Sequence, residues 1–199
     1  MVRVSASEVV GVEVLPPIIT RLRQQHPHLK VELVLTNRLI DLLQLEADIA
    51  VRMVRPSQAQ LLAQRIGLIE VGLHARDDYL HQHGTPQELK DLSGHAVIGY
   101  DQENAFIRSL AVKGFERSTF ALSSDSDLAQ LALIRAGAGI GGCQVKLAKQ
   151  DARLQRVLPE AFALKLDTWV TMHEDLRNSP RCRATFDALV AGLQRYVQD

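Results

Sequence analysis

The N-terminal part of the chain alternates between strand-like and helix-like patterns, and this alternation constrains the fold more than any other feature. Residues 2–5 and 29–35 place apolar and polar side chains in turn, as a half-buried strand does. Between them, apolar side chains recur over residues 15–22 at the spacing of one helix face. A short helix over residues 39–45 and an aliphatic strand over residues 48–54 follow. Strands separated by helices form parallel sheets through right-handed crossovers, so we expect an α/β fold.

Prolines mark both ends of the first expected helix. Pro16 and Pro17 favour a start near residue 15, because the first turn of a helix tolerates missing N–H donors. Pro27 ends the helix, since the residue before a proline avoids the helical conformation. The pattern therefore predicts a helix that begins at the prolines and stops before Pro27.

A second α/β series follows the first. A charged, turn-rich stretch over residues 76–94 is typical of a crossing between lobes. The same periodicities predict strands over 68–74, 95–100, 120–124 and 154–158, helices over 125–138 and 182–197, a glycine-rich segment over 139–144 and an extended run over 164–173. The extended run is long enough to return the chain to the first lobe.

These segments predict two Rossmann-like lobes joined by a double crossover. The first lobe is expected to be discontinuous and to combine residues 1–76 with residues 163–199, and the second to hold residues 77–162. Ligands of open parallel sheets bind outside the carboxyl ends of the strands, where helix N-termini present free N–H groups. We therefore expect a ligand site in the cleft between the lobes.

Composition and motifs exclude several functions. Lysine and arginine together number 23, as do aspartate and glutamate, and this balance argues against a nucleic-acid surface. No G-x-S-x-G or H-E-x-x-H motif occurs, and the glycines of residues 137–143 match no phosphate loop, so we expect no catalytic residues and no cofactor. Cys143 and Cys182 lack metal-ligand spacing, so we expect no metal site. They could form a redox pair, but two unlinked thiols are favoured.

The sequence also predicts that the protein does not contact a membrane. No stretch approaches the roughly 18 apolar residues that a membrane span requires. Glu8 and Glu13 interrupt any apolar region of the kind that a secretory signal needs. We therefore expect a cytoplasmic protein.

The strand over residues 48–54 opens on an acid, Asp48, and two interpretations follow. Asp48 could be a catalytic acid, but acid–base chemistry generally needs a second titratable partner and none is evident. The aliphatic run behind it is typical of a parallel strand covered on both faces. We favour a polar residue at the point where the loop meets the sheet.

Polar side chains cluster where strands end and helices begin. These candidates for ligand contact are Ser5, Ser7, Thr36, Asn37 and Asp125. Each could instead cap the helix that follows, and capping alone is the favoured explanation of any one of them. Ligand contact is supported by their expected positions, because the three strand ends that carry these polar residues are expected to face one cleft. Capping and ligand contact are compatible roles.

Three further residues lie at strand ends. Arg52 and Arg55 follow the strand over 48–54, where a guanidinium could hold an anion through two hydrogen bonds or could pair with a neighbouring carboxylate. The carboxylate pairing is favoured, since arginines more often face solvent or a structural partner. Tyr100 could reach the cleft or belong to a capped loop, and the loop is favoured.

Three segments together resemble the effector-binding domain of LysR-type transcriptional regulators. They are LPPIITRLRQQHPHLKVEL (15–33), LLQLEADIAVR (42–52) and AGAGIGG (136–142). The resemblance implies a periplasmic-binding-protein-like (type 2) fold with a small-molecule effector between its lobes. It also implies homodimers that pair into tetramers, and contact with DNA only through an N-terminal domain that this chain lacks.

The resemblance implies effector contacts at the first strand's end, after the second strand and after the glycine segment. These positions correspond to Ser5 and Ser7, to Thr36 and Asn37, and to Gln144. Many relatives have proline where Gln144 stands, and glutamine adds both donors and an acceptor. An aromatic acid or other small carboxylate suits the family, but no residue here fixes the effector. A solute-binding protein of transport and an enzyme on this fold are the alternatives.

Overall fold

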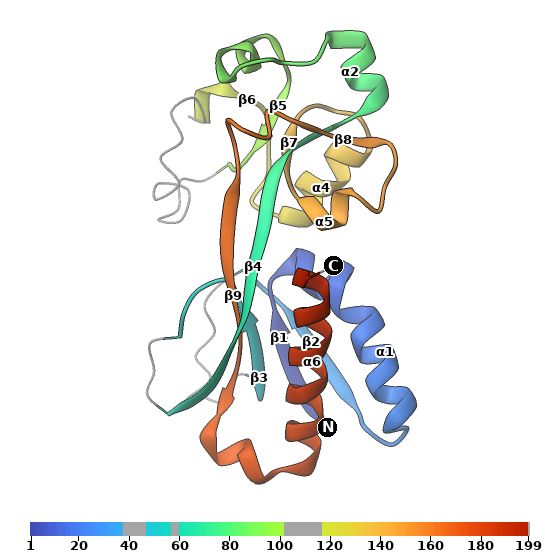
Figure 1. The fold of residues 1–199 in the computed structure, drawn as a ribbon, viewed down its shortest axis with the longest axis vertical. Helices are drawn as coiled ribbons and strands as arrows, with labels where there is room; N and C mark the ends of the chain where they lie inside the picture. Colours follow the sequence, from blue (N-terminus) through green and yellow to red (C-terminus); the bar gives the residue numbers. More distant parts are fainter. Residues whose placement is uncertain (38–46, 57–59, 102–116, 199) are drawn as a thin grey trace. The chain divides into compact units, whose positions relative to one another are not determined.

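A computed structural model describes residues 1–37, 47–56, 60–101 and 117–198, which form two compact units (Figure 1). The first unit comprises residues 1–69 with 166–199, and the second comprises residues 70–165. The chain enters the second unit within strand β4 (Leu61–Arg76) and returns within strand β9 (Leu164–His173). The lobe boundary predicted after residue 76 lies at the far end of β4, and the boundary predicted before residue 163 lies just ahead of β9.

The first unit is built on a sheet in the order β2-β1-β3-β9-β4. Strand β1 (Val2–Ala6) pairs in parallel with β2 (Val31–Leu35) on one side and with β3 (Ile49–Arg52) on the other. These three strands and their parallel pairing confirm the prediction from periodicity. Strand β9 runs antiparallel to β3. The helix predicted over residues 39–45 lies outside the described residues.

A π-helical turn that the sequence did not predict leads into the first helix. Helical turns begin at Glu8, pass through a π-helical turn (η1, Val10–Val14) and continue as α1 (Leu15–Gln25). The predicted start near residue 15, with the prolines in the first turn, is confirmed because α1 begins at Leu15. Consecutive prolines remove N–H donors from the ladder, and the wider π turn, closed by the Leu15 N–H donating to Val10 O, carries the chain into them. The predicted end before Pro27 is confirmed.

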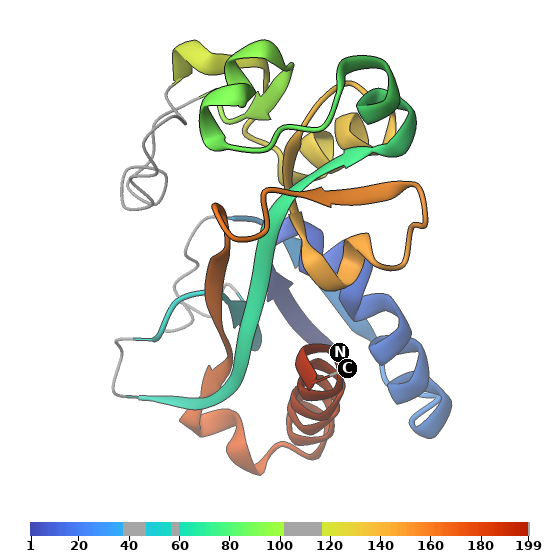
Figure 2. The ribbon, with the colours of Figure 1, turned by 45° about the horizontal axis from the view of Figure 1, so that its top comes forward.

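Helices α1 and α6 (Pro180–Gln198) pack side by side in the first unit (Figure 2). The predicted C-terminal helix over residues 182–197 is confirmed. A Cβ atom on Gly192 of α6 would lie 2.6 Å from Ile18 Cδ1, so this glycine allows the two helices to approach closely. The core of the unit contains fully buried side chains of the sheet and both helices, among them Val4, Ile49, Met172, Leu15, Leu22, Leu189 and Leu193.

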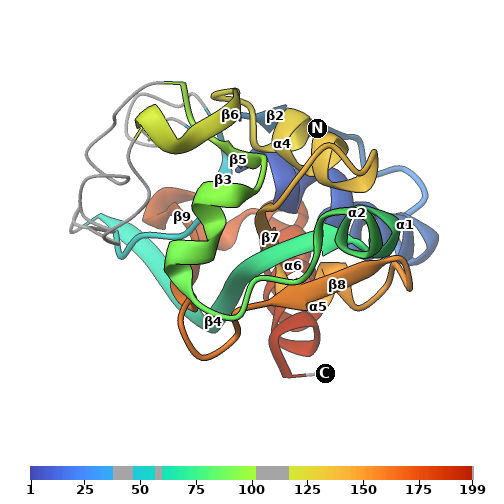
Figure 3. The ribbon, with the colours of Figure 1, turned by 90° about the horizontal axis from the view of Figure 1, so that it is seen from above.

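The second unit combines a short parallel pair with antiparallel strands. Strand β5 (Val97–Gly99) pairs in parallel with β6 (Phe120–Ser123) next to helix α4 (Asp127–Arg135) (Figure 3). Strands β7 (Gly141–Gln144) and β8 (Leu154–Val157) pair antiparallel with β4. The remaining helical elements are α2 (Asp77–His83), η3 (Leu89–Gly94), η4 (Arg117–Thr119), α5 (Val145–Ala148) and, in the first unit, η5 (Glu174–Asn178).

The glycine-rich segment after α4 has two structural roles. Gly137 adopts a φ of +78° just after the helix, the left-handed conformation in which a glycine commonly ends a helix. Gly139 passes so close to the neighbouring chain that a Cβ atom would lie 2.2 Å from Ala96 O. The segment therefore closes α4 and lets the backbone pass beside β5.

Candidate functional site

The carboxyl ends of β1 and β3 bring two predicted site residues into contact. Ser5 is fully buried on β1, and its Oγ donates to Val34 O at 3.2 Å. The same Oγ accepts a hydrogen bond from Nη2 of Arg52 at 2.7 Å. Because alternate residues of a strand share a face, Ser5 lies on the opposite face of the sheet from the buried Val4 and Ala6.

Arg52 is a buried cation without an anionic partner among the described residues. The residue is 9% exposed and its Nη1 donates to Val51 O at 2.8 Å. Its Nε is enclosed and has no hydrogen-bond partner within the described ranges. Burial lowers the pKa of the guanidinium to about 10, because desolvation disfavours the charged form. From the sequence, Arg52 was expected to pair with a neighbouring carboxylate. Among the described residues its acceptors are instead Val51 O and Ser5 Oγ.

The other first-unit candidates lie at the same edge of the sheet. Ser7 precedes the helical turn that starts at Glu8, and its Oγ lies 3.5 Å from Met53 Sδ. The Glu8 N–H donates to Asn37 Oδ1 at 3.1 Å, so the Asn37 side chain caps that turn from the end of β2. The Thr36 N–H donates to Ala6 O at 3.0 Å and prolongs the pairing of β1 and β2.

The second unit holds the remaining candidates. The Tyr100 hydroxyl donates to Asp127 Oδ1 at 2.8 Å, in the first turn of α4. Asp125 is exposed, and the side chain that caps α4 is Ser126, which accepts from the Ala129 N–H at 3.3 Å. Gln144 is 7% exposed at the end of β7. Tyr100, Asp125 and Gln144 thus belong to a different unit from Ser5 and Arg52, and their predicted ligand contacts stay predictions.

Trp169 is a neighbour of the site that sequence reasoning missed. It lies directly opposite Arg52 in the antiparallel pair of β3 and β9, so both side chains emerge on the same face. The Cζ atom of Arg55 lies 5.9 Å from the Trp169 ring centre, and the Trp169 Nε1–H donates to Asp167 Oδ2 at 3.0 Å. Its place beside Arg52 could not be predicted from the sequence, because the register of β9 against β3 cannot be inferred from local patterns.

Asp48 takes a structural role at the start of β3. Its Oδ2 accepts from the Arg3 N–H at 2.7 Å, and its own N–H donates to Arg3 O at 2.9 Å. Both bonds fix the register where β3 joins β1. This confirms the interpretation of Asp48 as a polar residue where the loop meets the sheet.

The described part of the chain offers no cluster of metal-ligating side chains and contains two buried cysteines. Within residues 1–37, 47–56, 60–101 and 117–198, no group of three or more His, Cys, Asp or Glu side chains could hold a metal ion. Cys143 and Cys182 are both buried and not joined in a disulfide, and each unit holds one of them. Among the described helices, none is long and apolar enough to cross a membrane.

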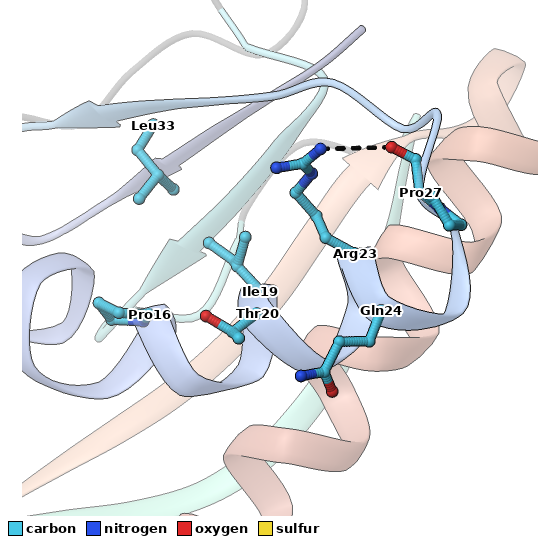
Figure 4. A pocket seen from close by; sticks show the side chains of 7 residues that line it. All are labelled: Pro16, Ile19, Thr20, Arg23, Gln24, Pro27 and Leu33. Carbon is cyan, nitrogen blue, oxygen red and sulfur yellow. Dashed lines mark hydrogen bonds between the residues drawn. The ribbon is translucent and has the colours of Figure 1, made fainter.

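An apolar groove runs between α1 and β2 of the first unit (Figure 4). It is lined by Pro16, Ile19, Thr20, Arg23, Gln24, Pro27 and Leu33. Arg23 borders it with Nη2 donating to Pro27 O at 3.2 Å. Leu33 and Leu35 of β2 are each 37% exposed, and β2 is the strand at the edge of the sheet.

His74 is a buried titratable group in the second unit. It is 2% exposed on β4, and its Nδ1 lies 3.0 Å from Gly72 O, so Nδ1 carries the ring proton. Arg156 of β8 lies directly opposite. Burial, with a smaller contribution from the Arg156 charge, lowers the pKa of His74 below its usual value. Burial likewise lowers the pKa of His95.

These shifts predict that acid destabilises the protein. A base whose pKa is lowered by folding binds fewer protons in the folded state, so its contribution to stability is full above the unfolded pKa and falls as pH drops below it. We expect the free energy of unfolding to decrease below about pH 6.5, by at most about 1.4 kcal/mol per pH unit for each histidine. Urea denaturation at pH 7.5 and 5.5 measures this decrease. His74→Leu should make it smaller, whereas the same change at the exposed His28 should not.

The chain is similar in sequence to a known protein family and to named transcriptional regulators. The LysR substrate binding domain family matches residues 1–194. The HTH-type transcriptional regulator CrgA of Neisseria meningitidis is 24% identical over 163 residues, which cover 80% of this chain and 54% of CrgA. The HTH-type transcriptional activator TtdR of Escherichia coli is 28% identical over 212 residues, which cover 98% of this chain and 65% of TtdR. The chain thus spans between about half and two thirds of the length of these relatives.

A solved structure shares the fold. The regulatory domain of CrgA, a LysR-type transcriptional regulator from Neisseria meningitidis, superposes with a TM-score of 0.84 at 22% identity. The match covers 96% of this chain and 98% of that domain.

Proposed function

The chain belongs to the LysR substrate binding domain family, and from this premise we propose that it senses a small-molecule effector for a LysR-type transcriptional regulator. Its mixed α/β fold is that of LysR regulatory domains, as the predicted periplasmic-binding-protein-like (type 2) class required. In this proposal the effector changes the geometry of a longer protein whose DNA contacts lie outside this chain, in the cytoplasm. Its relatives CrgA and TtdR are named as transcriptional regulators, and we assign the chain no catalytic residue.

The proposed effector is anionic, and buried Arg52 is the observation that carries this choice. A buried cation is costly unless a partner compensates it, and among the described residues Arg52 has only neutral hydrogen-bond acceptors. The helical turn at Glu8 begins at the same edge of the sheet, where its positive end favours an anion. A carboxylate or other oxoanion is the chemistry that both features suit.

Tryptophan fluorescence tests the proposal. Trp169 is the single tryptophan of the chain and faces the same side of the sheet as Arg52, so an anion bound there should alter its emission. Acetate, sulfate and inorganic phosphate would be titrated at constant ionic strength, with chloride as the control. We expect a saturable change for at least one anion and a rise in melting temperature that follows RT ln(1 + [L]/Kd). If no anion changes either signal, the proposed anionic effector is wrong.

We also propose that the chain forms homodimers through the groove between α1 and β2. The groove is open, its floor is apolar, and exposed Leu33 and Leu35 extend it along an edge strand. Edge strands with exposed apolar side chains readily take a partner. The resemblance to LysR-type regulators implies homodimers, and tetramers of the longer protein.

A charge introduced into this groove should separate the dimer. Leu33→Glu places a carboxylate among apolar side chains, so we expect its dimer dissociation constant to rise at least about a hundredfold. Light scattering coupled to size-exclusion chromatography measures the change. Leu68→Glu is a matched control, because Leu68 is 45% exposed on β4 and lies outside the groove. Equal effects of both substitutions would assign the loss to general destabilisation.

A further inference from the structure

We propose that Ser5 is a positioning residue, which holds Arg52 for the anion and does not itself contact the effector. This inference rests on the proposed function of the Arg52 site. It differs from the prediction made from the sequence, in which Ser5 contacts the effector directly. The hydrogen bonds of the Ser5 hydroxyl and the exposure of the side chain carry the argument.

The hydroxyl of Ser5 has no proton left for a ligand. A serine hydroxyl has one O–H donor, and Ser5 gives it to Val34 O at 3.2 Å. A lone pair of the same oxygen accepts the Arg52 Nη2–H at 2.7 Å. Ser5 is also 0% exposed, so it offers no surface to a molecule that arrives from solvent. Both hydrogen bonds of the Ser5 hydroxyl are therefore made to neighbouring protein groups.

The same bonds fix the guanidinium of Arg52. Nη2 is held by Ser5 Oγ and Nη1 by Val51 O at 2.8 Å, while Nε is enclosed and has no partner in the part of the chain that the structure describes. Each terminal nitrogen carries two N–H groups, so among the described residues one N–H remains without an acceptor on Nη1 and one on Nη2. Two such donors on one planar group match the two oxygens of a carboxylate or of a tetrahedral oxoanion.

Ser5 thereby ties the arginine to a rigid part of the sheet. Ser5 lies on β1, and its Oγ accepts a hydrogen bond from Arg52 of β3. The same hydroxyl donates a hydrogen bond to Val34 O of β2. Without this link the guanidinium would keep only its bond to Val51 O among the described residues. A long side chain released in this way regains rotamer freedom, which an anion must then remove on binding.

Two substitutions at Ser5 test the inference. Ser5→Ala removes the acceptor, and we expect the dissociation constant of acetate, sulfate or inorganic phosphate, whichever binds the wild type most tightly, to rise about tenfold. Ser5→Thr keeps the hydroxyl and should restore binding to within about threefold of the wild type. Both variants would be titrated by Trp169 fluorescence, and their melting temperatures would be measured without anion to separate positioning from a loss of folding.

A second measurement observes Arg52 without any ligand. The enclosed Nε–H should give a solvent-protected NMR signal in protein labelled with ¹⁵N-arginine, assigned by its loss in Arg52→Met. We expect Ser5→Ala to shift or broaden this signal and Ser5→Thr to restore it. An unchanged signal in Ser5→Ala, or wild-type anion affinity in that variant, overturns the positioning role. If no anion binds the wild type but the signal still depends on Ser5, the anionic effector fails while the positioning of Arg52 stands.

Discussion

Replacing Arg52 with methionine is expected to raise the dissociation constant of the bound anion at least about a hundredfold without lowering the stability of the protein. The loss of affinity follows from removing the buried charge of the site, since truncating one member of a buried charge pair costs about 2–5 kcal/mol. Stability should hold because methionine has a similar length and no polar atoms to leave unbonded. In the wild type, the enclosed Nε and the lowered pKa of Arg52 both indicate that its burial is costly.

The fluorescence titration described above measures the affinity, and urea denaturation measures the stability. Arg55→Met is the matched control, because Arg55 is exposed and contacts the face of Trp169. We expect it to change anion affinity by less than about threefold, the effect of an exposed and screened charge. Equal losses in the two variants would indicate general electrostatic attraction and would remove Arg52 from its central place in the site.

Replacing Gly139 with alanine is expected to destabilise the protein by about 3 kcal/mol, the upper end of the usual cost of overpacking. The new Cβ would lie 2.2 Å from Ala96 O. That carbonyl cannot move away freely, because it accepts the Ile140 N–H at 2.9 Å, and the Ile98 N–H in turn donates to Ile140 O at 2.8 Å. Relief of the clash therefore breaks the connection between β5 and the segment before β7.

Gly142→Ala provides the control for this substitution. A Cβ at Gly142 would lie 3.5 Å from Val71 Cγ1, which is an ordinary contact, and the residue is exposed. We expect its free energy of unfolding to stay within about 0.5 kcal/mol of the wild type, as for most surface substitutions. Urea denaturation followed by far-ultraviolet circular dichroism compares the two variants. Similar losses would mean that loss of glycine flexibility, and not the contact with Ala96, determines the cost.

The elements that sequence predicted well are those set by local periodicity. The alternation over residues 2–5 and 29–35 and the aliphatic run over 48–54 correspond to β1, β2 and β3, and their parallel pairing followed from the helices expected between them. The C-terminal helix followed from one apolar face. In each case neighbours within a few residues determine the backbone conformation.

The elements that were missed depend on distant neighbours. Strand β4 was predicted over residues 68–74 but begins at Leu61, because its first half does not alternate and gains its partner only when β9 returns. The π turn ahead of α1 was also not predicted, because no periodicity of apolar side chains marks it.

The candidate site shows the same division. Placing polar residues at strand ends brought Ser5 and Arg52 forward as candidates. Their hydrogen bond spans 47 positions of sequence, and the pairing of Trp169 with Arg52 depends on the register of β9. In the described structure no carboxylate lies beside Arg52. This depends on which distant segments pack around Arg52, and local sequence does not reveal that packing. Sequence could therefore nominate the residues but not their roles.

The discontinuous first unit fixes an order of assembly during synthesis. The second unit uses residues 70–165 without interruption, so its chain has left the ribosome before the first unit has received residues 166–199. Until then the apolar face of α1 is not covered by Leu189 and Leu193 of α6, which complete the core of the first unit. Closing that core requires contacts across most of the chain, which form slowly. Of the two units, the one whose synthesis begins earlier is thus the one that finishes folding later, and the nascent chain must stay soluble with that surface uncovered.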